Sequence, residues 1–187
     1  LFDAFKSNSG GGGGNNRLEK TVERAEKRVH AQPRSAVAWG ELARAQYQLA
    51  GLGENYDQNT GAFTAKGRTE LRKVERSWDR YLALDPPKPN ADLASLMVQA
   101  FSSTGLNRPA KAVTAQEIVV DGRPPSTGLY STLAILAYQA GQTRKGDLAS
   151  GKAVQLAPKD QRSTLRDQLK SAKQQAAVAG AQSTTSG

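Results

Sequence analysis

The sequence predicts an all-α fold, and three observations lead to this prediction. Twenty-eight alanines stand against ten valines and two isoleucines in a chain of 187 residues, which favours helices over sheets. Apolar residues recur at spacings of three and four along most of the chain, as on the buried face of an amphipathic helix. Glycine or proline follows most of these runs, where either residue would end a helix.

The chain begins with a stretch that we expect to be a flexible linker, residues 1–16, because it combines five consecutive glycines with serine and asparagine. The first helix is expected over residues 17–31, before Pro33.

Two helices joined by a long connection are expected next. The first ends at Gly51, and the second ends before Asp85-Pro86. The apolar face of the first comprises Trp39, Leu42, Ala43 and Tyr47, and that of the second comprises Val74, Trp78, Tyr81, Leu82 and Leu84.

The connection, residues 51–67, is an insertion where a short turn would be enough. Its segment 59–61 (Asn-Thr-Gly) predicts a tight turn, with Tyr56 and Phe63 across from each other in a small hairpin. Because long loops in compact proteins are often functional, Tyr56 and Phe63 are also expected contacts for a partner. A purely structural hairpin is the alternative.

The C-terminal half predicts further helices. Residues 91–122 and residues 130–158 each have the pattern of a helix pair, and Gly141 separates the two helices of the second pair. Residues 161–179 are expected to form a capping helix with a polar outer face, and residues 180–187 a disordered tail.

These features resemble the tetratricopeptide repeat, a helix–turn–helix unit of 34 residues with small and aromatic residues at fixed positions. A complete unit is carried by Tyr130, Leu133, Ala134, Ala137, Gly141, Gly146, Ala153 and Pro158. A less complete unit is carried by Trp39, Leu42, Ala43, Tyr47, Trp78 and Pro86, with Tyr81 where a small residue is usual. The resemblance implies a repeat domain over 17–160, a short right-handed array of helix pairs. An unrelated bundle of α-hairpins is the alternative.

The resemblance also implies a function. In this family the first helices of the repeats line a concave groove that binds an extended peptide or a partner helix. We therefore expect a non-enzymatic scaffold for protein–protein interaction, with an unidentified protein or peptide as partner. The family's clamp for a terminal carboxylate is matched only at Arg44, so we do not expect binding of a chaperone tail. The positions of this sequence that correspond to the groove are Glu41, Arg44, Gln48, Val98, Phe101, Ile135, Tyr138 and Gln139. Packing against a neighbouring helix is the alternative for each.

The charge of the chain suggests a second function. Its net charge is +9, which favours contact with an anionic polymer such as nucleic acid or a cell-envelope polymer. However, the basic residues are interspersed with acidic ones at helical spacings, which is typical of solvated helix faces. Nucleic-acid binding is therefore the alternative to the scaffold, and self-association is a third reading.

The sequence offers no basis for catalysis, a cofactor or a metal site. It contains no cysteine and one histidine, which excludes thiolate and multi-histidine chemistry. The glycine run lacks the Lys-Ser/Thr step of a phosphate-binding loop. Asp57, Asn59 and Gly61 are spaced as in a calcium loop, but the remaining ligands of such a loop are missing. We therefore predict no catalytic residue, no metal and no cofactor.

The chain begins with Leu1 rather than methionine and continues into a linker. We expect from this an upstream membrane anchor, as in bacterial envelope proteins that carry such repeats. The composition, rich in alanine, arginine, glycine and glutamine, also suggests a bacterium. A tag remnant or a cytoplasmic protein is the alternative.

Overall fold

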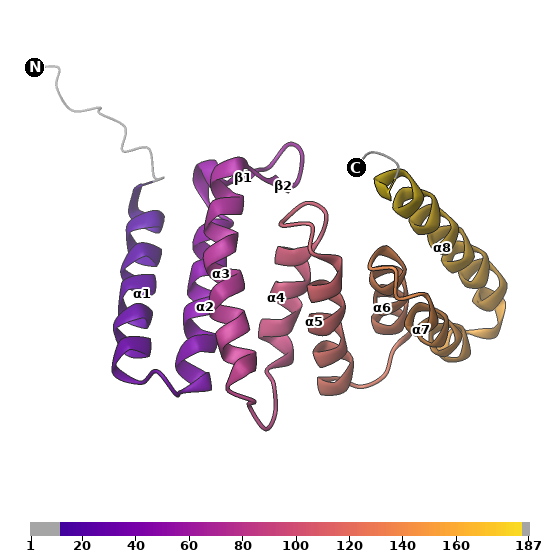
Figure 1. The fold of residues 1–187 in the computed structure, drawn as a ribbon, viewed down its shortest axis with the longest axis horizontal. Coiled ribbons are helices and arrows are strands. Elements are labelled where there is room, and N and C mark those ends of the chain that lie inside the picture. Colours follow the sequence, from indigo (N-terminus) through magenta and orange to yellow (C-terminus); the bar gives the residue numbers. More distant parts are fainter. Residues whose placement is uncertain (1–11, 185–187) are drawn as a thin grey trace, which may run out of the picture. The chain divides into compact units, whose positions relative to one another are not determined.

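A computed structural model describes residues 12–184, and these residues confirm the all-α prediction (Figure 1). They form eight α-helices, two short 3-10 helices and one two-stranded hairpin. The chain divides into two compact units, the first ending at Pro87 and the second beginning at Lys88. Each unit is described by itself. None of the helices within the described residues combines the length and the apolar character that crossing a membrane requires.

The first unit contains three long helices, and the second of them contacts both others. Small and aliphatic side chains make the contact between the first two helices, with Ala25 and Val29 packed against Ala38 and Leu42. Ser35 caps the second helix, because its side chain accepts a hydrogen bond from the backbone N–H of Ala38. The helices are α1 (Gly12–Ala31), α2 (Ala36–Ala50) and α3 (Ala65–Ala83).

The buried face of α3 is larger and more aromatic. Trp78 is 1% exposed, and its ring stacks on that of Tyr81 at a centroid distance of 5.2 Å. A polar pair lies within this packing, where the Ser77 hydroxyl donates to Gln46 Oε1 at 2.7 Å. The Ser77 hydroxyl and the Gln46 side-chain oxygen are therefore paired with each other within the apolar interface.

The insertion between α2 and α3 forms the predicted hairpin, from the 3-10 helix Gly53–Asn55 and the strands β1 (Tyr56–Asp57) and β2 (Ala62–Phe63). The antiparallel register pairs Tyr56 with Phe63, which confirms the prediction. Their rings meet edge to face at 5.3 Å, and Phe63 also contacts the ring of Tyr47 on α2. In the turn, Asp57 Oδ1 accepts from the backbone N–H of Asn59, and this bond lowers the pKa of Asp57.

The hairpin is fastened to the ends of both neighbouring helices. Asn55 Nδ2 donates to the carbonyl of Leu49, and the Asn55 carbonyl accepts from the backbone N–H of Thr64. The Thr64 side chain caps α3 by accepting from the N–H of Gly67. Gly67 lies so close to Asn55 that a Cβ atom would be 1.9 Å from the Asn55 carbonyl oxygen. The connection is therefore a packed part of the first unit.

The second unit contains five helices. Each of the first four packs against the next in sequence, and the last contacts the two before it. Asn90 and Ser126 cap two of these helices with their side chains, and Pro109 occupies the first turn of another. The helices are α4 (Ala91–Phe101), α5 (Pro109–Gly122), α6 (Thr127–Gln139), α7 (Thr143–Leu156) and α8 (Arg162–Thr184).

Both terminal predictions need correction where the structure describes the residues. The expected linker reaches residue 16, but α1 begins at Gly12; residues 1–11 lie outside the described part. The expected tail begins at residue 180, but α8 continues to Thr184, beyond the expected end of the capping helix. In both cases a helix continues into small and polar residues, because adding a residue to an existing helix costs far less than starting one.

A polar cluster attaches α8 to the preceding helix pair. The Tyr138 hydroxyl donates to Asp147 Oδ1 at 3.0 Å, and Lys173 Nζ donates to both carboxylate oxygens of Asp147 at 2.8 Å. The hydrogen bond from Lys173, followed by that from Tyr138, lowers the pKa of Asp147. Asp147 thus links α6, α7 and α8.

Replacing Lys173 by glutamine is expected to raise the pKa of Asp147 toward its ordinary value. Because the folded-state pKa is lowered, the cluster stabilises the fold above the ordinary carboxyl pKa, and this contribution is lost as the pH falls through the lowered value. The variant should lose less stability in acid than the parent. Carboxyl NMR titration of Asp147 measures the shift, and Lys170→Gln on the same helix is the control. An unchanged Asp147 titration in Lys173→Gln would contradict the assignment.

Candidate functional site

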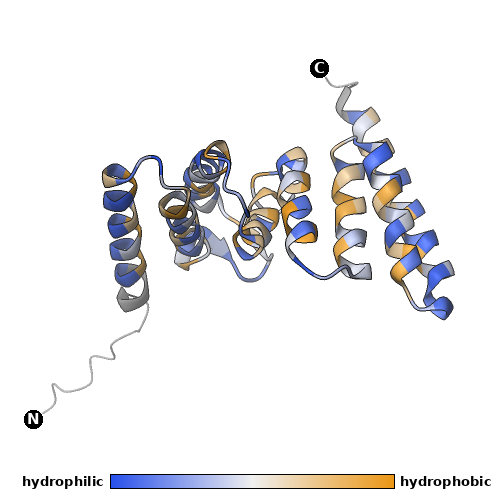
Figure 2. Cartoon of the chain, turned by 90° about the horizontal axis from the view of Figure 1, so that it is seen from below, coloured by the Kyte–Doolittle hydropathy of each residue, from blue (hydrophilic) through white to orange (hydrophobic). Residues whose placement is uncertain are grey.

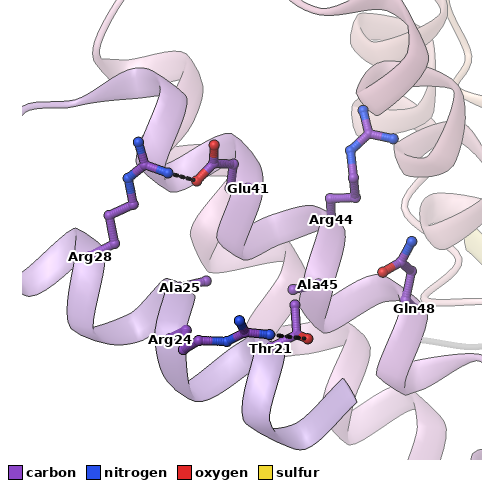
Figure 3. Close-up of a pocket in the computed structure, with 8 residues that line it drawn as sticks. All are labelled: Thr21, Arg24, Ala25, Arg28, Glu41, Arg44, Ala45 and Gln48. Carbon is purple, nitrogen blue, oxygen red and sulfur yellow. Dashed lines mark hydrogen bonds and ion pairs between the residues drawn. The ribbon is translucent and has the colours of Figure 1, made fainter. Parts of the chain in front are cut away.

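A groove of about 410 Å³ lies between α1 and α2 in the first unit (Figure 3). We call it the α1–α2 groove. Each helix contributes four lining residues at the spacing i, i+3, i+4 and i+7, which is one face of a helix. The lining residues are Thr21, Arg24, Ala25 and Arg28 from α1, and Glu41, Arg44, Ala45 and Gln48 from α2.

Two alanines form the apolar floor of the groove. Ala25 is 8% exposed and Ala45 is 4% exposed, so both methyl groups belong to the packed interior. Larger side chains at these two positions would fill the space between the helices. The groove therefore exists because small residues face each other there, next to the core residues Val29 and Leu42.

The walls of the groove are mainly basic. Its lining contains three arginines, Arg24, Arg28 and Arg44, and one acidic residue, Glu41. Arg28 Nη1 and Glu41 Oε2 lie 2.6 Å apart in an ion pair that joins α1 to α2 at the groove. Both side chains are about half exposed, at 50% and 47%. An ion pair with this exposure contributes little to stability, on the order of 0–1 kcal/mol.

The second arginine that α1 contributes to the groove, Arg24, is hydrogen-bonded to neutral groups. Arg24 Nη2 donates to the Thr21 hydroxyl, and Arg24 Nε donates to the Lys20 carbonyl, both at 3.3 Å. Figure 3 shows its guanidinium group extended along the helix toward Thr21. These bonds fix the direction of the side chain without neutralising its charge, so the charge remains available to an anionic group.

A second depression, of about 720 Å³, continues this surface along α1, and we call it the α1 depression. It shares Thr21 and Arg24 with the α1–α2 groove. Figure 2 shows hydrophilic residues along much of this helix. Within the depression, Lys27 pairs with Glu23 at 2.7 Å and lowers the pKa of that carboxyl group. Its lining is Arg17, Lys20, Thr21, Glu23, Arg24 and Lys27.

Three of the residues predicted to bind a partner meet in the α1–α2 groove: Glu41, Arg44 and Gln48. The other predicted groove residues belong to the second unit. There Val98, on α4, is half-buried, whereas Ile135 and Gln139, on α6, are exposed. The structure brings the first-unit set together around one cavity.

Two predicted groove residues are instead core residues, and this corrects the prediction. Phe101 is completely buried, and Tyr138 is only 6% exposed. The Tyr138 ring lies directly on α7, where a Cβ atom at Gly146 would come within 2.4 Å of two ring carbons. A small residue and an aromatic residue fit together in this way inside a helix pair. Because Phe101 and Tyr138 are both buried, neither of these side chains is available to a partner.

The two aromatic residues of the hairpin, Tyr56 and Phe63, differ in how deeply they are buried. Phe63 is 6% exposed because it packs against Tyr47 and Tyr56, so it is a core residue rather than the expected partner contact. Tyr56 is half-buried.

Sequence reasoning missed the contribution of α1 to the groove. Its helical spacing was visible, but the spacing alone does not show which faces of α1 and α2 meet. On α1 the small residue Ala25 is flanked by two basic residues, Arg24 next to it and Arg28 one helical turn after Arg24. A small residue flanked by basic residues in this way is the signal that could have indicated a lined groove.

The described residues contain no group of three or more His, Cys, Asp or Glu side chains placed to hold a metal ion. What the groove offers chemically is guanidinium and amide donors above an apolar floor. Comparison of the chain with models of known protein families gives no match, and comparison with curated protein sequences gives none either.

Proposed function

We propose that the protein is a non-enzymatic protein–protein interaction module, and that the α1–α2 groove holds a peptide segment of its partner. The observation that carries this proposal is the meeting of Glu41, Arg44 and Gln48 around a single cavity with an alanine floor. An apolar centre surrounded by polar and arginine side chains is the usual composition of a protein-binding surface.

We further propose that the helix pairs α2–α3, α4–α5 and α6–α7 are successive repeats resembling the tetratricopeptide unit, with α8 as a cap. Two observations support this. The first residues of α5 and α7, Pro109 and Thr143, are 34 residues apart, which is the length of such a repeat. Gly146 and Tyr138 fit together within the last pair as a small residue and an aromatic residue do in that unit.

Photo-cross-linking tests the proposed site. A photoreactive amino acid in place of the exposed Gln48 is expected to form a discrete protein–protein product in native extract, since Gln48 lines the groove. The same amino acid in place of Arg76, which is exposed on α3, serves as the control. Excess unlabelled chain should compete the product away. Equal products from both positions, or a product that nuclease removes, would contradict the proposal.

A further inference from the structure

We infer that the α1–α2 groove selects an acidic peptide segment and that Glu41 sets its affinity by competing with the ligand for Arg28. This inference rests on the proposed function, because it specifies the chemistry of the segment that the groove holds. The partner surface is defined by charge complementarity: the lining carries three guanidinium groups and one carboxylate.

The donors in the groove suit carboxylate groups. Arginine presents a planar fork of N–H donors that matches a carboxylate, and Arg24, Arg28 and Arg44 place three such forks around the alanine floor. The side-chain amide of Gln48 adds a neutral donor at the same surface. Methyl or methylene groups of the bound segment would contact Ala25 and Ala45 between these donors.

The ion pair between Glu41 and Arg28 is an example, within the chain itself, of a carboxylate bound by an arginine of the groove. Its carboxylate lies 2.6 Å from Arg28 Nη1, across the groove from its own helix to α1. Because the pair is half exposed, a carboxylate of the partner can replace Glu41 at Arg28 at little cost to the fold. Glu41 therefore lowers the affinity of the groove for acidic segments. It also raises the selectivity for segments with many carboxylates, since a segment with few carboxylates cannot displace Glu41 from Arg28.

The length of the basic surface defines the length of the segment. From Arg17 to Arg28 the helix rises about 16 Å, at 1.5 Å per residue. An extended peptide covers that distance with about five residues. The α1 depression adds Arg17 and Lys20 for carboxylates that extend beyond the groove itself, whereas its Lys27 is already paired with Glu23.

A nucleic acid is the less favoured ligand. The lining of the groove and of the α1 depression contains no aromatic side chain on which a base could stack. The apolar floor also has no role in binding a phosphate backbone, whereas it matches the side-chain methylenes of a peptide.

Fluorescence anisotropy with the complete chain tests the inference. One labelled peptide alternates Glu and Ala, and its matched peptide has Gln in place of every Glu. At physiological ionic strength the acidic peptide should bind more tightly. The double variant Arg24→Gln/Arg44→Gln should weaken its binding about tenfold, whereas Arg76→Gln, outside the groove, should not.

The critical variant is Glu41→Gln, which should bind the acidic peptide about two- to fivefold more tightly because Arg28 is released. Glu26→Gln, an exposed residue of α1 outside the groove lining, makes the same change in net charge and should leave binding unchanged. Equal effects of Glu41→Gln and Glu26→Gln would overturn the role of Glu41.

Different results would overturn the selection of acidic segments and the proposed binding function. Equal binding of the acidic and the Gln peptide, weakened by the groove variants, would overturn charge selection and leave the binding function standing. No binding of either peptide would overturn both. Tighter binding of a short DNA duplex than of the acidic peptide, with steep salt dependence, would replace the peptide with an anionic polymer.

Discussion

Replacing Trp78 by alanine is expected to destabilise the first unit by about 3–5 kcal/mol, the usual cost of removing a large aromatic side chain from a core. Trp78 is 1% exposed and stacks on Tyr81 on the buried face of α3. The cavity left behind would lie on the buried face of α3, beside Ser77, whose hydroxyl donates to Gln46 on α2. Denaturant unfolding followed by circular dichroism and tryptophan fluorescence measures the change.

Trp39 provides the matched control. The chain contains two tryptophans, and Trp39 is only partly buried, with its Nε1 donating to the Pro33 carbonyl at 3.0 Å. Trp39→Ala should therefore cost less, about 1–2 kcal/mol. In Trp78→Ala the remaining Trp39 still reports unfolding of the first unit. A cost for Trp78→Ala no larger than that for Trp39→Ala would show that the packing of α3 on α2 is wrongly placed.

Gly67→Ala is expected to have the second-largest effect, a destabilisation of about 3 kcal/mol, at the upper end of the usual cost of overpacking. A Cβ atom at Gly67 would be 1.9 Å from the Asn55 carbonyl oxygen and 2.9 Å from its carbon. Because the obstacle is backbone, it cannot move aside as a side chain would. The 3-10 turn and hairpin must then separate from the start of α3.

Gly151→Ala makes the same substitution without an obstacle. Gly151 lies within α7, and apart from its own stretch of helix backbone no atom comes within 4 Å of the Cβ position. Alanine there should stabilise the fold by about 0.5–1 kcal/mol through its higher helix propensity. Melting temperatures of the two variants, measured side by side, should therefore move in opposite directions. A small change in Gly67→Ala would contradict the docked hairpin.

Much of the local structure could be predicted from the sequence, because it depends on short-range patterns. The turn residues Asn59-Thr60-Gly61 define the hairpin register, which is why the pairing of Tyr56 with Phe63 was predictable. Pro33 and Gly141 likewise mark places where helices end. The helix ends near Gly12 and Thr184 were less predictable, since no cap residue marks them.

The candidate site was only partly predictable. The resemblance to the tetratricopeptide repeat pointed to Glu41, Arg44 and Gln48 on α2, and the structure brings them to one groove. Positions carried over from that resemblance do not distinguish an exposed face from one covered by another helix, so Phe101 and Tyr138 were expected to be available although they are buried. Which side chains are covered depends on contacts between helices, and a single sequence does not report those contacts.

The most direct test of the central claim is a backbone-amide NMR titration of the complete chain with the peptide of alternating Glu and Ala. The groove account predicts that the largest shift changes lie along one face of α1 and α2, from Thr21 to Arg28 and from Glu41 to Gln48. Changes spread over basic residues of every helix, α8 included, would contradict a specific groove and indicate general attraction to an anion.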